Sequence, residues 1–417
     1  MAVQRDEQGF LYDRFAREAV AAALEDTPVV AITGPRQAGK STFVAELLGR
    51  DLEVVTLDDP VERAAAQRDP TSYVEDRPRT LVIDEVQRVP ELLLAIKASV
   101  DRRRTPGRFI LTGSTRLLTA PQLSESLAGR IELVDLWPFS QGELGDRREQ
   151  FVDIAFGAPG TLRIDSELTR RDYMERVCRG GFPEAVRRAG SRRDQWFENY
   201  ATTVVQRSVR DIAHVDRADA FPTLVRLCAA RTAQELNVQS IATDLGVPYR
   251  TVGTYMAHLQ TVFLTHHIPA WSRNLTSKVV HRPKLMMIDS GLAAHQLGVS
   301  PDSIRDDGPA GQLLETFVAL EIRKQLGWSR TRPALFHFRD RDGAEVDVVL
   351  EARSGHVVGC AVKASATVRA EDFRGLRLLQ DRLGARFVNG FVLYTGRNYV
   401  PFGERLAAVP ISTLWQA

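Results

Sequence analysis

"TPVVAITGPRQAGKSTFVAELLGR", residues 27–50, combines an apolar run, a glycine-rich loop and a segment with helical spacing. The apolar run over 29–33 predicts a buried strand, and GPRQAGKS at 34–41 matches the pattern GxxxxGKS. Phosphate binding needs this order, because glycines let backbone amides wrap the phosphates and the following helix adds positive potential at its amino end. The stretch therefore predicts a phosphate-binding loop and a nucleotide site.

The predicted nucleotide contacts lie in this loop and at the start of the helix. Lys40 is expected to reach the outer phosphates, and the Ser41 hydroxyl to ligate Mg²⁺. The alternative is a glycine-rich turn that happens to hold a lysine. The full predicted set is Gly34, Pro35, Arg36, Gln37, Ala38, Gly39, Lys40, Ser41 and Thr42.

Two acids follow a second apolar run, "RTLVIDEVQRV", residues 79–89. Burying a carboxylate is costly unless it is paired or faces a cation, and the carboxyl ends of parallel strands are where open α/β sheets bind ligands. We expect Asp84 to hold the Mg²⁺ shell and Glu85 to polarise the attacking water. The alternative is a strand followed by a solvated acidic turn.

Polar residues end a third apolar run, "RFILTGST", residues 108–115. A side chain such as that of Thr112, Ser114 or Thr115 could hold water against the γ-phosphate. From the residues alone, the three side chains stay open as alternatives for this sensing role.

Arg130 stands at the head of a further strand, in "SESLAGRIELVDLWPFSQGEL". An arginine in this place could act on a neighbouring subunit's nucleotide as an arginine finger. It could equally cap a helix or form a salt bridge, and Arg116 is a rival for the finger role. These alternatives stay open at the level of sequence.

The apolar runs alternate with helical stretches along the first 145 residues. This rhythm is typical of an α/β fold in which a parallel sheet has helices on both faces. The predicted strands are 29–33, 52–57, 80–85, 107–113 and 130–136.

Several motifs of the chain resemble, as a set and in order, the AAA-type ATPases of a widespread prokaryotic family. They are "GPRQAGKST", "LDDP", "LVIDEVQRVPELL", "FILTGSTR" and "LAGRIELVDLWPFSQGEL", followed by "GGFPEAV", "VVQRSVRDI", "LMMIDSGLAAHQLG" and "GQLLETFVALEI".

Members of this family carry a domain of unknown function in the carboxyl half. The resemblance implies ATP binding and hydrolysis, and it gives Lys40, Ser41, Asp84, Glu85 and Ser114 the roles stated above. A serine stands at 114 where many such ATPases use asparagine.

The middle of the chain, taken as 146–300, reads as a helical linker followed by a winged-helix domain. "SIATDLGVPYRTVGTYMAHLQTVFL" has a helix, a glycine turn at Gly246 and a second helix near Pro248, and the strand-like "LTHHIPAW" would make a wing. Tyr249, Arg250 and Thr251 would then begin a recognition helix. Few basic residues flank them, so contact with DNA and a pure packing role stay open as alternatives.

The last part, taken as 301–417, has the element order of the restriction-endonuclease-like fold. A helix carries Glu315 and Glu321, and a strand with Asp347 and a strand with Lys363 follow, separated by glycine turns at 342–343 and 354–355. Acids in that fold bind Mg²⁺, and the lysine positions or activates water.

One acid of this pattern is missing, because Ala361 stands two residues before Lys363, where the fold uses a carboxylate. Since alternate strand residues share a face, the missing group would have been a metal ligand. Glu345 could substitute for it. We expect a nuclease-like fold without nuclease activity; the alternative interpretation is an Asp347–Lys363 ion pair that ties two strands together.

Composition is ordinary for a globular protein, with a net charge of +2 and 44% hydrophobic residues over 417 positions. The three scattered cysteines (Cys178, Cys228 and Cys360) form no disulfide framework or zinc spacing. The sequence has no run that is typical of a signal peptide or a membrane span. We expect a cytoplasmic protein without a membrane partner.

The sequence favours a Mg²⁺-dependent ATPase of three domains, 1–145, 146–300 and 301–417. It would couple hydrolysis to conformational work as a homo-oligomer, with DNA as the expected partner. The alternative is a nucleotide-gated switch or scaffold that signals by binding a partner without acting on DNA. A third interpretation, a DNA-processing enzyme in which ATP controls cleavage or strand movement, also stays open.

Overall fold

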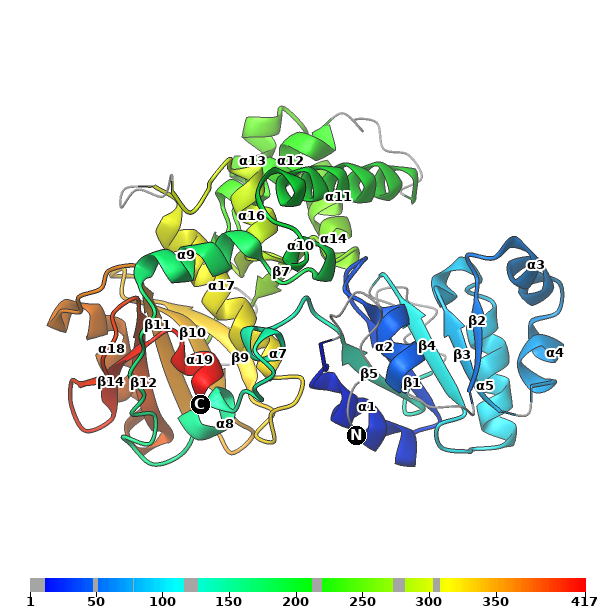
Figure 1. The fold of residues 1–417 in the computed structure, drawn as a ribbon, viewed down its shortest axis with the longest axis horizontal. Helices are drawn as coiled ribbons and strands as arrows, with labels where there is room; N and C mark the ends of the chain where they lie inside the picture. Colours follow the sequence, from blue (N-terminus) through cyan, green and yellow to red (C-terminus); the bar gives the residue numbers. More distant parts are fainter. Residues whose placement is uncertain are drawn as a thin grey trace. The chain divides into compact units, whose positions relative to one another are not determined.

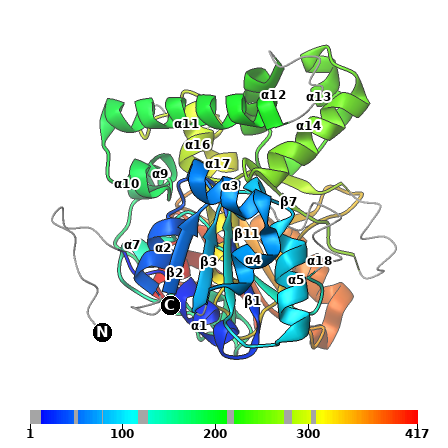
Figure 2. The ribbon, with the colours of Figure 1, turned by 90° about the vertical axis from the view of Figure 1, so that its right-hand side faces the viewer.

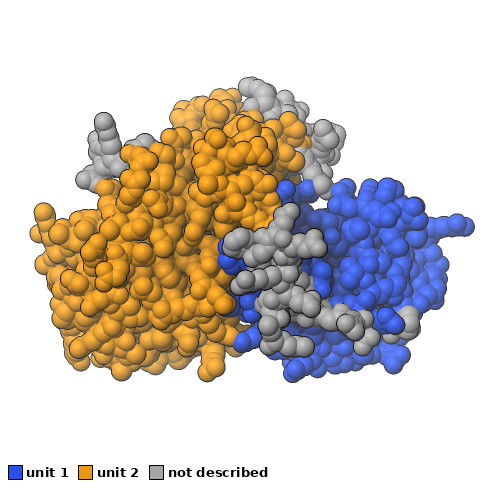
Figure 3. All heavy atoms as spheres, in the orientation of Figure 1, with its two compact units in different colours: residues 1–139, 261–263 blue, residues 140–260, 264–417 orange. Residues whose placement is uncertain are grey.

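The computed structural model describes residues 12–47, 52–77, 79–115, 127–211, 220–272, 282–302 and 308–417. The chain divides into two compact units (Figure 3). Unit 1 comprises residues 1–139 with 261–263, and unit 2 comprises 140–260 with 264–417. The division of the second unit into two domains stays a prediction.

Unit 1 is built on a parallel sheet with the strand order β2-β3-β4-β1-β5 (Figure 1). This order places β4 between the strand that enters the phosphate loop and the strand that ends in the acids. Its strands are β1 (Val29–Thr33), β2 (Leu52–Thr56), β3 (Thr80–Asp84), β4 (Phe109–Gly113) and β5 (Ile131–Asp135). All five predicted strands are therefore confirmed to within two residues at each end.

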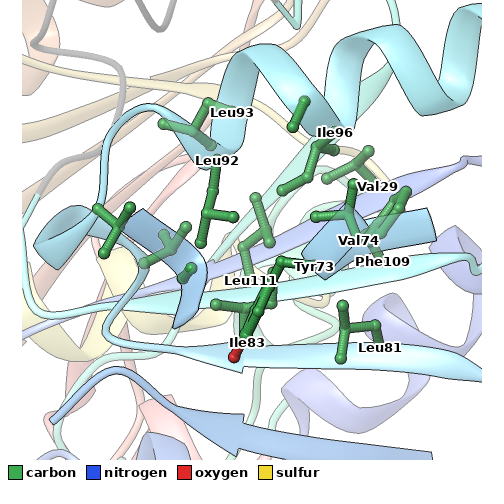
Figure 4. Packing of buried hydrophobic residues seen from close by; sticks show 14 of the residues in the cluster. Val29, Tyr73, Val74, Leu81, Ile83, Leu92, Leu93, Ile96, Phe109 and Leu111 are labelled. Carbon is green, nitrogen blue, oxygen red and sulfur yellow. The ribbon is translucent and has the colours of Figure 1, made fainter. Parts of the chain in front are cut away.

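Helices cover both faces of this sheet, because the inner strands are apolar on both sides. In β1, Val29 and Ala31 pack into one core with α4 and α5, and Val30 and Ile32 pack into another with α1 and α2. Figure 4 shows the first core, and Figure 2 shows α3, α4 and α5 on that face. The helices are α1 (Ala16–Asp26), α2 (Lys40–Leu47), α3 (Pro60–Arg68), α4 (Pro70–Glu75) and α5 (Leu92–Arg102).

Unit 2 contains a six-stranded mixed sheet with the order β13-β14-β12-β11-β10-β9. Strands β9, β10 and β11 pair antiparallel around the two predicted glycine turns, and β11, β12 and β14 pair in parallel. Helices α17 (Ala310–Gln325) and α18 (Arg374–Leu383) pack on it. The strands are β9 (Ala334–Arg339), β10 (Glu345–Glu351), β11 (Val357–Lys363), β12 (Phe387–Tyr394), β13 (Val400–Pro401) and β14 (Leu406–Pro410).

A second, three-stranded sheet of unit 2 has the order β6-β8-β7. Two helices precede its hairpin, and Gly246 closes the first of them with a left-handed φ of 62°, which a glycine adopts without strain. The elements are β6 (Gln234–Glu235), α13 (Val238–Leu245), α14 (Tyr249–Thr261), β7 (Thr265–Ile268) and β8 (Lys284–Met287).

The remaining helices of unit 2 bring two of the quoted motifs together. Asp289, of "IDSG", accepts hydrogen bonds from the amides of Gly181 (2.7 Å) and Leu292 (2.9 Å), and a Cβ on Gly180 would come within 2.2 Å of its carboxylate. These contacts join "GGFPE" to "IDSG" within unit 2. The helices are α7 (Gln141–Leu144), α8 (Phe151–Ala155), α9 (Arg170–Arg179), α10 (Pro183–Val186), α11 (Gly190–Asp211), α12 (Ala220–Ala230), α16 (Ser290–Gln296) and α19 (Thr413–Gln416).

The described helices include none that combines the length and the apolar character needed to cross a bilayer.

Candidate functional site

The phosphate loop joins β1 to α2 and needs its glycines for two physical reasons. A Cβ on Gly34 would lie 2.1 Å from the carbonyl oxygen of Leu136, so no other residue fits beside the segment that follows β5. Gly39 has a φ of 89°, a conformation that side chains disfavour. The backbone of the loop is thus shaped by glycine at both ends.

Lys40 is buried inside this loop, with 6% of its surface exposed. Its Nζ donates hydrogen bonds to the carbonyl oxygens of Gly34 and Pro35, each at 2.9 Å. Burial lowers the pKa of Lys40 to about 8, although Glu85 and Asp84 oppose this change. The carbonyl groups of the loop therefore fix the position of the ammonium group.

Asp84 ends β3 and lies within reach of the first turn of α2. The Ser41 hydroxyl donates to its Oδ2 at 3.2 Å, and the Thr112 hydroxyl from β4 donates to its Oδ1. Hydroxyl and carboxylate oxygens are the ligands that Mg²⁺ takes in proteins. The convergence of Ser41 and Asp84 therefore fits the predicted magnesium ion.

Glu85 follows directly and has a left-handed backbone, with a φ of 56°. Its Oε2 accepts a hydrogen bond from Ser114 Oγ at 3.1 Å and another from the side-chain amide of Gln87. The Gln87 amide also lies 3.2 Å from Ser114 Oγ, so the three side chains form one network. Strained backbone held in this way is common at functional sites. The structure thus brings the predicted Glu85 and Ser114 together.

Two residues of this region were not predicted from sequence. Gln87 is one, although the sequence shows this glutamine two residues after Glu85. Arg14 is the other: its guanidinium is buried and donates to the carbonyl oxygens of Ala38 (3.0 Å) and Trp137 (2.6 Å). Arg14 therefore ties the phosphate loop to the segment after β5, and nothing local in the sequence marks it.

Arg130 immediately precedes β5, whose first residue pairs with Val29. It therefore lies at the end of the sheet where the parallel strands begin. The phosphate loop follows β1 at the other end, about 16 Å away along the strands. Its Nε pairs with Asp101 Oδ1 at 2.6 Å, and its Nη1 donates to the carbonyl of Ala128. A role on a nucleotide would thus need a second copy of the chain. Its rival Arg116 lies outside the described residues.

The alternative Asp347–Lys363 ion pair is wrong. Lys363 Nζ pairs instead with Asp372 at 3.0 Å, and Asp347 pairs with Lys284 at 3.2 Å. The physical reason is the register: the antiparallel pairing of β10 with β11 begins at Val348 and Cys360, so Lys363 extends beyond the paired segment.

Two other acids of the nuclease-like pattern lie beside basic residues. Glu345 is exposed and lies 3.8 Å from Arg339, while Glu321 is buried and pairs with Lys324 at 2.5 Å. Ala361 is buried among apolar side chains. Among the described residues, no group of three or more His, Cys, Asp or Glu side chains is arranged to hold a metal ion.

The amino end of α14 is open to solvent. Tyr249 is 55% exposed, Arg250 is exposed and Thr251 is half-buried. The segment after β7 is engaged with the larger sheet: the Trp271 amide donates to the His337 carbonyl at 2.6 Å, and the His337 amide donates to the Pro269 carbonyl at 3.0 Å. A wing at this position therefore has part of its backbone committed to β9.

Comparison with known families assigns each part of the chain to a domain. Residues 26–145 match the AAA domain family, residues 170–303 match a domain of unknown function (DUF8612), and residues 310–414 match another (DUF4143). The resemblance drawn from the sequence motifs is thereby confirmed, and the chain carries an AAA domain of the P-loop ATPase type.

Two mycobacterial proteins are similar over most of this chain. They bear the names uncharacterized protein Mb2031c of Mycobacterium bovis and uncharacterized protein Rv2008c of Mycobacterium tuberculosis. Each is 28% identical over 393 residues, which cover 93% of this chain and 81% of the relative.

Solved structures give weaker likenesses. The Walker-type ATPase PABY2304 of Pyrococcus abyssi is 15% identical, with a TM-score of 0.43 over 70% of this chain and 97% of its own. A single-residue variant of Thermotoga maritima RuvB is 20% identical, with a TM-score of 0.27 over 61% of this chain and 89% of its own.

Proposed function

We propose, starting from the AAA domain at residues 26–145, that unit 1 binds and hydrolyses ATP with Mg²⁺. The observation that supports this proposal most strongly is the arrangement of four side chains at the carboxyl ends of the parallel strands. There, Lys40 and Ser41 follow the loop after β1, and Asp84 and Glu85 stand at the end of β3. Ser41 is hydrogen-bonded to Asp84, and the charges of both acids act on Lys40. A site that only bound nucleotide would not need Glu85, whose carboxylate is held by its own hydrogen-bond network.

Nucleotide binding in this proposal rests on the loop residues Gly34 to Thr42. Backbone amides of the loop surround the phosphates, and Lys40 exchanges its two carbonyl partners for phosphate oxygens. Ser41 and Asp84 would hold Mg²⁺, which neutralises charge between the outer phosphates. Binding thus uses groups that are already in place.

Hydrolysis rests on the residues at the ends of β3 and β4. Glu85 would accept a proton from the attacking water, while Ser114 and Gln87 hold the carboxylate in position. Ser114 fills the sensing role proposed from the sequence, with Gln87 as a positioning residue beside it.

ATP affinity should fall as the pH rises above about 8. Phosphate binding favours the ammonium form of Lys40, and burial lowers the pKa of this group to about 8. Below pH 8 the free protein already carries the proton, so affinity is flat; above it, binding takes up one proton and affinity falls by up to about tenfold per pH unit. Titration with a fluorescent ATP analogue between about pH 7 and 9.5 measures this.

Lys40→Arg is the matched control, because an arginine stays protonated over this range. The affinity of this variant, whatever its size, should be independent of pH. A wild-type affinity that stays constant to the upper end of the titration would show that Lys40 is not the group that titrates.

The finer part of the proposal is an association with DNA through a winged helix. The order α13, turn, α14 and the three-stranded sheet support it, as does the exposed amino end of α14 with Tyr249 and Arg250. The homo-oligomer, the cytoplasmic location and the restriction-endonuclease-like nature of the last domain are proposals as well.

The alternative, a nucleotide-gated switch or scaffold, is favoured by two observations at the same place. Arg250 is the one basic residue in the first turn of α14, and phosphate contacts dominate the affinity of DNA-binding proteins. The backbone groups of Pro269 and Trp271 are hydrogen-bonded to His337, so these groups already have partners within the chain. A protein of this kind would signal through a protein partner.

ATPase rates with and without duplex and branched DNA separate the two functions. We expect DNA to stimulate turnover, and Arg250→Ala to lose most of the stimulation while keeping the basal rate. Arg192→Ala, which removes an exposed arginine on α11, is the matched control. Turnover that is indifferent to both DNA forms, with no DNA binding at low salt, would favour the switch. In either case we expect no cleavage of the DNA in Mg²⁺ or Mn²⁺.

A further inference from the structure

Three charged side chains meet in the interior of unit 2, away from the nucleotide site. Lys284 of β8 donates a hydrogen bond to Glu315 Oε1 of α17 and lies 3.2 Å from Asp347 Oδ1 of β10. Lys284 is 5% and Asp347 7% exposed. One ammonium group is therefore clamped between two carboxylates that come from different elements.

This lysine is held as a cation by its neighbours. Burial disfavours the ammonium charge, but Asp347 and Glu315 outweigh it, so that the pKa of Lys284 lies above its ordinary value. Burial and then Asp347 raise the pKa of Glu315, although Lys284 acts in the opposite direction. Without the lysine, the buried carboxylate of Asp347 and the partly buried carboxylate of Glu315 would face each other with no cation between them.

The position of the cluster coincides with the acids of the nuclease-like pattern. Glu315 is the helix acid and Asp347 the strand acid that such a centre would use for Mg²⁺. Asp347 Oδ2 accepts a hydrogen bond from the Val362 amide at 2.8 Å, which fixes the carboxylate with its other oxygen toward Lys284. The cation that this pair of acids requires is supplied by the chain itself.

We propose that Lys284 is a built-in replacement for a divalent cation, and that removing its charge converts Glu315 and Asp347 into a divalent-cation site. This inference is independent of the ATPase proposal. It accounts together for three departures from the nuclease pattern: Ala361 in the acid position, Lys363 paired with Asp372, and Lys284 seated on the acids.

The replacement also changes what the cluster does. Lys284 lies in the segment matched by one domain family, and both acids lie in the segment matched by the next. The Thr232 and Thr316 hydroxyls, 2.8 Å apart, join the same two segments. In this proposal, an ion cluster that fixes the three-stranded sheet to α17 and β10 takes the place that a metal centre has in the nuclease-like pattern.

Mn²⁺ binding to the full chain, without nucleotide, tests the proposal. Wild type, Lys284→Met and Lys284→Met/Asp347→Asn are titrated with Mn²⁺, and free Mn²⁺ is followed by electron paramagnetic resonance. The phosphate loop is the same in all three and sets the background. We expect Lys284→Met to bind one additional Mn²⁺ per chain, at least tenfold more tightly than any site of the wild type, and the double variant to return to background.

Two results would overturn the proposal. One is a folded Lys284→Met protein that binds no more Mn²⁺ than wild type. The other is a wild-type protein whose Mn²⁺ binding disappears in Asp347→Asn, because the acids would then bind metal despite the lysine.

Loss of folding in Lys284→Met still gives a decisive result, read from the thermal unfolding midpoint. Either Mn²⁺ or the second substitution Asp347→Asn should then restore the folded protein, since each relieves the carboxylate repulsion. If neither restores it, the carboxylates are not what Lys284 neutralises and the proposal fails.

Discussion

Glu85→Gln protein should bind ATP as tightly as wild type and lose turnover by about 10²–10⁴-fold, the usual contribution of a general base. The carboxylate accepts hydrogen bonds from Ser114 and Gln87, and it acts on Lys40 of the phosphate loop through its charge. Glutamine keeps the size and the hydrogen bond from Ser114 while removing the basic oxygen. Steady-state phosphate release and equilibrium ATP binding measure the two quantities separately.

Lys40→Ala is the matched variant, because it should fail at the earlier step. Hydrogen bonds to charged groups contribute about 1.5–3 kcal/mol each. Loss of the ammonium should therefore weaken ATP binding by roughly 10–150-fold for one such bond, and by more where both phosphates are contacted. The empty protein should stay folded, since the change also removes a buried charge whose pKa is lowered to about 8 by burial.

The two variants together define what would contradict the assignment. If Glu85→Gln hydrolyses ATP at the wild-type rate, Glu85 is not the base. If Lys40→Ala binds ATP normally, the loop is a glycine-rich turn and the nucleotide site lies elsewhere.

Local signals carried most of what could be predicted for unit 1. The strands are short apolar runs that end at polar residues. Each of these signals lies within a few positions of the strand that it predicts. The positions of Lys40, Ser41, Asp84 and Glu85 near strand ends could be predicted for the same reason, because a phosphate loop and an acidic strand end are each contiguous in sequence; their roles stay predictions. In a parallel sheet, the carboxyl ends of β1 and β3 then lie on the same side of the sheet, where such folds bind ligands.

The contacts that sequence could not provide are long-range. Arg14 binds the carbonyl of Trp137, 123 residues away, and Lys284 lies against Asp347, 63 residues away. Neither lysine nor arginine carries a local mark of its partner. Asp347 and Lys363 show the converse: their spacing suggested a pair, yet Asp347 is held by Lys284 from a different sheet.

Arg130→Ala should bind ATP normally and lose about 10³-fold or more in turnover if the arginine acts as a finger on a neighbouring subunit. Arg130 lies where the parallel strands begin, whereas the phosphate loop lies where β1 ends. A loss of turnover of this size would therefore come from action on the nucleotide of another copy of the chain. The structural alternative is the ion pair with Asp101. Both partners are partly exposed, and such a pair contributes about 0–1 kcal/mol to stability.

Asp101→Asn separates these two roles, because it breaks the ion pair and keeps the arginine. A finger predicts that only Arg130→Ala loses turnover, whereas a structural role predicts similar small losses of stability in both variants and full activity.

Mixing Arg130→Ala with Lys40→Ala protein gives the sharper measurement. The first retains a competent nucleotide site and the second supplies an intact arginine, so a shared site should recover activity that neither has alone. A mixture as inactive as its components would contradict a site shared between subunits.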